Sequence, residues 1–166
     1  EEKNPTMWAA VTLMVQFAMR PVDAAELRWD AFQRDGECWV LKYIPSKTKG
    51  RTLRPRPVLW PVTDDLYNRL RKAGGEEYIV NHPSPYLRYA YYIRFINAEM
   101  RKLGWHREKY RKACYELRKL CVDAIYHNLG AEKASQISGD NIQTVIKYYA
   151  DRNRCGFEGV DVSKMI

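Results

Sequence analysis

The stretch from Tyr115 to Tyr149 carries the most restrictive pattern in the sequence. Its first part has apolar residues three and four positions apart, the spacing of a buried stripe on an amphipathic helix: Leu117, Leu120, Cys121, Ala124 and Ile125. Gly130 follows as an expected helix end. A short helix over 132–137, a turn over 138–141 and a last helix from Ile142 complete the pattern. The stretch therefore predicts a set of packed helices.

A proline interrupts the helical pattern at the start of the chain. Residues 5–19 are apolar on nearly every side, which predicts a helix inside the core with Thr6 as its cap. The residue before a proline is disfavoured in helical geometry, so this helix should end at Met19-Arg20. Pro21 suits the first turn of a second helix. Arg20 is therefore predicted at an elbow between two helices, where its guanidinium group can project into a cleft.

A β-hairpin pattern comes next. Residues 38–44 are rich in aromatic and β-branched side chains, and residues 52–60 return as a strand weakened by two prolines. Between them lies a polar tip with Lys47, Lys49 and Arg51. Further helices are expected over 64–72 and from Leu87 onwards. The predicted fold class is therefore α+β, mainly helical, with a small antiparallel β-sheet.

The composition limits the number of domains and indicates the kind of binding partner. The chain has 166 residues, 46% of them hydrophobic, which is enough for one domain with its own core. We expect residues 1–166 to form a single domain, excised from a longer chain because the sequence starts at Glu1 without Met. Lys and Arg number 28 against 20 Asp and Glu, a formal net charge of +8. This balance favours a polyanionic partner such as nucleic acid.

The cysteine spacing and the hydropathy of the sequence indicate the cellular compartment of the protein. The four cysteines lack zinc-ligand spacing, so we expect reduced thiols and no metal site. No signal peptide pattern precedes the first helix. No apolar run approaches the roughly 20 residues that span a bilayer. We therefore expect a cytoplasmic protein that acts on DNA inside a cell.

Five short patterns, in this order along the chain, resemble the tyrosine recombinases, or phage-type integrases. Arg20 opens a box with an acidic residue three positions later, Leu seven later and Trp nine later. The hairpin lysine follows. Tyr115-Glu116-Leu117-Arg118 then matches the His-x-x-Arg helix of the family, Ile137-Ser138-Gly139 matches its Leu-Gly-His turn, and Tyr148 or Tyr149 matches its nucleophile. The resemblance covers residues 8–151.

The resemblance implies the catalytic domain of a site-specific DNA recombinase, from a phage or mobile element. Tyr149, or alternatively Tyr148, would attack a DNA phosphodiester and form a 3′-phosphotyrosyl link. Lys47, or alternatively Lys49, would act as general acid. The family needs no metal or cofactor, binds double-stranded DNA as a tetramer, and has a separate N-terminal DNA-clamping domain. The isolated catalytic domain could be a monomer.

The chemistry of DNA cleavage explains why such a site would contain two arginines. The transition state of phosphoryl transfer carries extra negative charge, and a guanidinium group is permanently charged and can bridge two phosphate oxygens. Arg20 and Arg118 are the predicted pair. Lys49, Arg51 and Lys119 are predicted to contact DNA.

Two positions depart from the family pattern. Tyr115 stands where the family has His, and a phenol is a poor proton carrier near neutral pH. At the second histidine the ungapped match places Gly139, whereas a match shifted by one places Asp140. Glycine has no side chain, and an aspartate would repel phosphate. A catalytically degenerate DNA-binding module of the same fold is therefore the alternative to an active enzyme.

Overall fold

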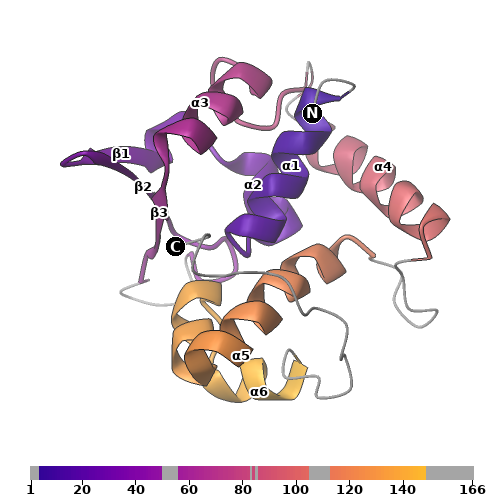
Figure 1. Cartoon of the computed structure of the whole chain (residues 1–166). Helices are drawn as coiled ribbons and strands as arrows, with labels where there is room; N and C mark the ends of the chain where they lie inside the picture. The colour runs from indigo at the N-terminus through magenta and orange to yellow at the C-terminus, as the bar shows by residue number, and fades with distance from the viewer. Residues whose placement is uncertain (1–3, 50–55, 83, 85, 105–112, 149–166) are drawn as a thin grey trace.

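A computed structural model describes residues 4–49, 56–82, 84, 86–104 and 113–148 of the chain (Figure 1). The described elements are α1 (Pro5–Gln16), α2 (Pro21–Glu26), a short 3-10 helix (Trp29–Ala31), β1 (Phe32–Asp35), β2 (Cys38–Tyr43), β3 (Val58–Val62), α3 (Asp64–Ala73), α4 (Arg88–Lys102), α5 (Tyr115–Ser138) and α6 (Ile142–Tyr148). The described part is thus mostly helical. None of its helices is both long and apolar enough to cross a membrane.

The first helix is shorter than its sequence predicted. The side chain of Asn4, not Thr6, caps α1 by accepting a hydrogen bond of 3.1 Å from the backbone nitrogen of Met7. The helix ends at Gln16, so the prediction that it continues to Met19 was wrong. Ala18 interrupts it with a left-handed backbone, at φ 50°. Pro21 begins α2, as predicted.

The sheet has three strands in the order β1-β2-β3, and both pairs are antiparallel. The predicted antiparallel pair is confirmed, since Tyr43 pairs with Val58. Its second strand, however, runs over Val58–Val62 and not over 52–60 as predicted, and residues 52–55 lie outside the described residues. Strand β1 was not predicted. It pairs with β2 through the tight turn at Gly36, whose φ of 59° suits a residue without a side chain.

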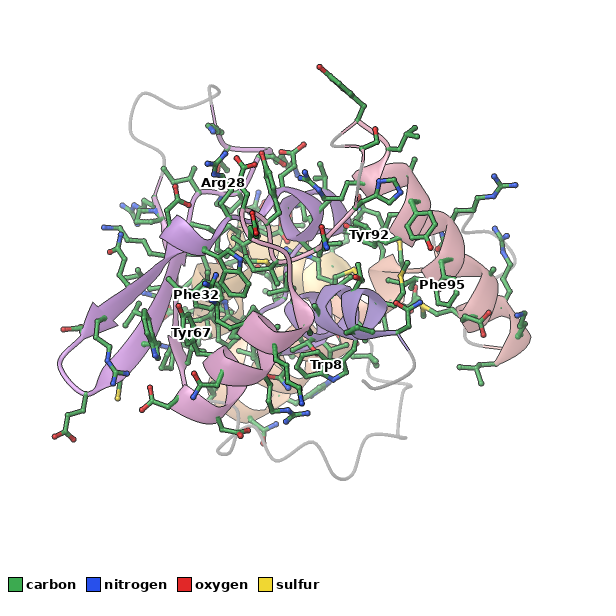
Figure 2. All side chains as sticks on the ribbon, turned by 90° about the horizontal axis from the view of Figure 1, so that it is seen from above. Trp8, Arg28, Phe32, Tyr67, Tyr92 and Phe95 are labelled. Carbon is green, nitrogen blue, oxygen red and sulfur yellow. The ribbon has the colours of Figure 1, made fainter. Side chains whose placement is uncertain are left out.

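Helix α1 lies at the centre of the molecule, with the sheet and α4 on opposite sides and α5 and α6 below (Figure 1). Its core residues include Leu13 and Met14, which are fully buried. Seen from above, Phe32 and Tyr67 meet where the sheet approaches α3 (Figure 2). Trp39 stacks on Tyr67 in the same aromatic cluster, with ring centroids 3.8 Å apart.

Helix α5 is broken where the sequence predicted a helix end. Gly130 has non-helical angles, φ 86° and ψ 171°, so the element consists of two helical pieces. The second piece ends at the left-handed Gly139, and α6 follows after a short turn. These elements confirm the mainly helical α+β class. In α4, Tyr92, Ile96 and Met100 are buried against the core.

Candidate active site

The elbow between α1 and α2 and the start of α5 bring two predicted arginines together. Arg20 precedes Pro21 in an extended conformation, and Arg118 lies on the inner face of α5, one turn after Tyr115. Both side chains are buried, with 11% and 1% of their surface exposed. A buried charge is costly unless it is paired. These arginines therefore need anionic or carbonyl partners.

Asp140 is the partner that both arginines share. Its Oδ1 accepts a hydrogen bond of 2.7 Å from Nη2 of Arg20, and its Oδ2 accepts one of 2.7 Å from Nη2 of Arg118. Burial opposes ionisation of this carboxyl group, but the charges of Arg118 and Arg20 outweigh it, so the pKa of Asp140 lies below its ordinary value. One carboxylate thus bridges the two guanidinium groups.

Backbone carbonyl groups fix Arg118 from the other side. Its Nη1 donates to the carbonyl oxygen of Ala18, and its Nη2 donates to that of Ser138 at 2.9 Å. The left-handed backbone of Ala18 therefore stands directly beside a predicted catalytic residue, a place where such conformations are often found. Arg118 therefore connects the α1–α2 elbow, through Ala18, with the α5–α6 turn, through Ser138 and Asp140.

Asp23, in the first turn of α2, joins Arg20 to the hairpin. Its Oδ2 lies 3.7 Å from Nη1 of Arg20, and its Oδ1 accepts a hydrogen bond of 2.8 Å from the backbone nitrogen of Ser46. Lys47 is the next residue. Lys47 and Lys49 are both exposed in the turn over 46–49, at the tip where they were predicted.

The hydroxyl groups of Tyr115 and Tyr43 both interact electrostatically with Arg20 and Arg118. Tyr115 is partly buried, and burial raises the pKa of its hydroxyl group although Arg20 and Arg118 oppose this shift. A protonated Tyr115 can donate a hydrogen bond but cannot carry a positive charge as His can. Burial also raises the pKa of Tyr43 in β2, whose hydroxyl group has no hydrogen-bond partner among the described residues. Sequence reasoning gave Tyr43 no role.

The remaining predicted site residues are placed as follows. Gly139 ends α5 with φ 66°, and its α-carbon faces the base of the hairpin, so that an added Cβ would lie 3.3 Å from Cγ of Pro45. Lys119 is half-buried on α5. Tyr148 ends α6, while Tyr149 and Arg51 lie outside the described residues.

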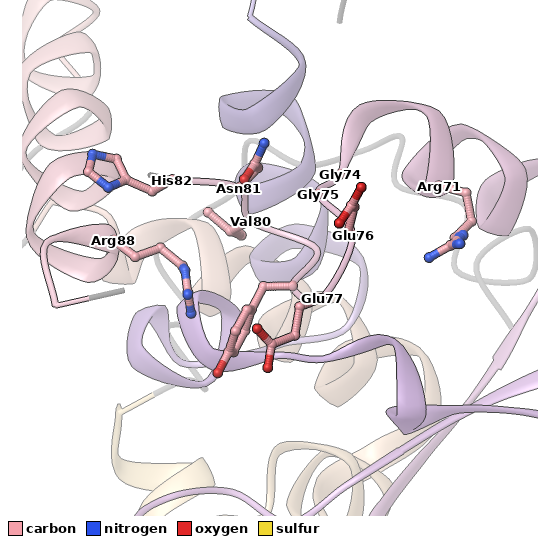
Figure 3. Close-up of a pocket in the computed structure, with 10 residues that line it drawn as sticks. Arg71, Gly74, Gly75, Glu76, Glu77, Val80, Asn81, His82 and Arg88 are labelled. Carbon is pink, nitrogen blue, oxygen red and sulfur yellow. The ribbon is translucent and has the colours of Figure 1, made fainter. Parts of the chain in front are cut away.

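A separate polar pocket of about 710 Å³ lies between the end of α3 and the start of α4 (Figure 3). Arg88 lines it, buried, with its guanidinium group 3.5 Å from the centroid of the Tyr78 ring and one hydrogen bond of 3.2 Å to the carbonyl oxygen of Ala25. Neither Arg20 nor Arg118 is among the described residues that line this pocket. Sequence reasoning did not assign it.

The fold matches that of the catalytic domain of tyrosine recombinases. Three solved structures show this. A lambda integrase dimer bound to a COC′ core site matches with a TM-score of 0.64 at 18% identity, over 98% of this chain and 58% of that one. XerH site-specific recombinase bound to difH substrate, in a pre-cleavage complex, matches with a TM-score of 0.63 at 13% identity, over 89% of this chain and 43% of that one.

A XerH post-cleavage complex with palindromic difH substrate matches with a TM-score of 0.60 at 12% identity, over 84% of this chain and 40% of that one. The chain thus spans about half the length of these structures, or less. At these identities the likeness establishes the fold alone. No family model and no curated protein matches the sequence.

Proposed function

We propose that this chain is the catalytic domain of a site-specific DNA recombinase that cleaves and rejoins strands through a tyrosyl intermediate. The observation that carries the proposal is the geometry of Arg20 and Arg118, which hold the two oxygens of one anion at 2.7 Å each. A phosphodiester also presents two charged oxygens from one centre. The structural neighbours, recombinases solved on DNA, agree with this class.

The other residues take roles around the phosphate. Arg20 and Arg118 stabilise the extra negative charge of the transition state. Lys47, on the exposed hairpin tip, protonates the departing 5′-oxygen, with Lys49 as the alternative. Tyr149, or alternatively Tyr148, is the nucleophile. Tyr115 donates a hydrogen bond to a phosphate oxygen in place of the family histidine.

A covalent-trapping assay tests the proposal. The protein is incubated with supercoiled DNA, the reaction is quenched with detergent, and protein that stays attached to the DNA is quantified. We expect an adduct that is lost with Tyr149→Phe and retained with Tyr148→Phe. Tyr86→Phe is the matched control, since the Tyr86 side chain is almost fully exposed. An adduct lost only with Tyr148→Phe would keep the function and change the nucleophile.

The second candidate is a DNA-binding module without turnover. Two observations favour it: Asp140 occupies the arginine pair, and a tyrosine stands at the position of the first family histidine. Salt-sensitive DNA binding without an adduct in any variant would select this candidate. Both candidates predict that the domain binds double-stranded DNA.

A further inference from the structure

The arginine pair is already occupied in the protein alone. The two oxygens of Asp140 take the positions at which a phosphodiester would offer its two charged oxygens. With Asp23, the cluster joins two guanidinium groups to two carboxylates, so the formal charges of these four groups sum to zero. A neutral cluster attracts a phosphate much less than two unpaired arginines would.

The backbone around Asp140 is held in place as well. The hydroxyl group of Ser135 donates a hydrogen bond of 2.6 Å to the carbonyl oxygen of Asp140, and the backbone nitrogen of Asp140 donates one of 3.2 Å to the hydroxyl oxygen of Ser138. The Asp140 side chain is 7% exposed. The carboxylate is therefore a built part of the site, not a surface group that happens to lie near it.

We propose that Asp140 is an internal ligand of the arginine pair, which a DNA phosphate displaces when it binds. Three anionic groups cannot share two guanidinium groups without strong repulsion, so the phosphate and the Asp140 carboxylate compete for the same donors. This inference rests on the proposed function, because it takes a DNA phosphate as the competing anion.

The displacement would take place next to α6, the helix that ends at Tyr148. Asn141 directly follows Asp140 and caps α6, since its Oδ1 accepts a hydrogen bond of 2.7 Å from the backbone nitrogen of Thr144. Phosphate binding at the arginine pair would thus act directly beside the start of α6, and without DNA Asp140 keeps both arginines occupied.

Replacement of the competing charge provides the test. Asp140→Asn removes the negative charge and keeps the size, whereas Asp140→Glu keeps the charge. Asp30→Asn is the matched control, because it removes one carboxylate that is 80% exposed and pairs with Arg28. The affinity of each protein for a mixed-sequence DNA duplex is measured over a range of salt concentrations.

We expect Asp140→Asn to bind the duplex about tenfold tighter at low salt, the effect of roughly one additional charge-assisted contact. Its plot of log K against log salt should be steeper than that of the wild type by up to about 0.9, because the site that binds the phosphate then carries one more net positive charge. Asp140→Glu and Asp30→Asn should keep the slope of the wild type.

The outcomes separate this inference from the proposed function. Equal slopes for wild type and Asp140→Asn, with DNA binding intact, would overturn the inference and leave the function standing. A steeper slope for Asp140→Glu would also overturn it, since the charge would then not be the cause. No binding of any of the proteins to DNA would contradict the function itself.

A wild-type measurement covers the case in which Asp140→Asn does not fold. The carboxyl carbon resonance of Asp140, assigned with Asp140→Glu, is followed by NMR as the duplex is added. We expect a new chemical shift in the saturated complex, because the carboxylate leaves the two guanidinium groups. An unchanged resonance in the saturated complex would overturn the inference.

Discussion

The backbone nitrogen of Ser46 donates a hydrogen bond of 2.8 Å to Asp23, which connects the hairpin turn directly to the helix that follows Arg20. The acidic residue of the arginine box therefore contacts two predicted catalytic elements at once. Through it, the position of the Lys47 turn depends on the same side chain that lies beside the Arg20 guanidinium group.

We expect Asp23→Ala to lower the free energy of unfolding by about 1–3 kcal/mol, because it removes a buried acceptor from a backbone donor. Asp23→Asn keeps an oxygen for the Ser46 nitrogen and should retain the turn. Urea unfolding measures the first effect, and amide hydrogen exchange over residues 46–49 measures the second. Equal exchange in the two variants would show that this hydrogen bond does not hold the turn.

Gly139 and Gly36 both have a positive φ, so their alanine variants separate the cost of backbone strain from the cost of a steric contact. Gly139→Ala and Gly36→Ala both place a side chain at a positive φ, which costs about 1 kcal/mol. An added Cβ at Gly139 also lies 3.3 Å from Pro45, whereas nothing lies within 4 Å at Gly36. Urea unfolding should therefore show a larger loss for Gly139→Ala.

DNA binding separates the same two glycine variants further. Gly139 precedes Asp140 and faces the hairpin base, so only Gly139→Ala should alter DNA affinity. A change of similar size in Gly36→Ala would indicate that general destabilisation, not the geometry of the α5–α6 turn, is responsible.

The ion pairs of Asp140 predict a pH dependence of stability. Because its pKa in the folded protein is below its ordinary value of 3.8, the carboxylate stabilises the fold above that value, and this contribution is lost as the pH falls through the lowered pKa. The difference in unfolding free energy between wild type and Asp140→Asn should be constant from about pH 5 to 7 and shrink below about pH 4. A difference that does not vary with pH would contradict the assigned ion pairs.

The cysteines should differ sharply in reactivity. Cys38 is exposed, whereas Cys121 is buried, and burial raises the pKa of its thiol to about 12. Iodoacetamide at neutral pH should modify Cys38 rapidly and leave Cys121 unmodified until the protein unfolds. Mass spectrometry of tryptic peptides gives the rate at each position, with Cys114 as a second buried thiol. Rapid modification of Cys121 would show that α5 opens readily.

The elements with strong local signals could be predicted from the sequence. Pro21 correctly predicted the start of α2 and Gly130 a helix end, because each residue acts on the backbone at its own position. The early end of α1 could not be predicted. It depends on Ala18, a residue that favours helices but adopts a left-handed conformation, with its carbonyl group bonded to Arg118 from a distant helix.

In the candidate site, too, some features could be predicted from the sequence and others could not. The sequence order predicted that Arg20 and Arg118 belong together, and the structure places them on one carboxylate. Asp140 was noted in the sequence as the shifted match and as a group that repels phosphate. Its contact with both arginines could not be predicted, because a pairing across 120 positions of the chain leaves no local pattern.

Arg118 and Arg20 differ in the hydrogen bonds that orient their guanidinium groups, and this difference affects how a ligand would be recognised. Arg118 keeps two backbone carbonyl acceptors whether or not Asp140 is present, so its orientation is preorganised and binding costs it little entropy. Among the described residues, Arg20 has Asp140 as its hydrogen-bond acceptor, and its Nη1 donates to none of them. Arg118 would therefore act as a fixed reference point, while Arg20 adapts to the geometry of the anion that replaces the carboxylate.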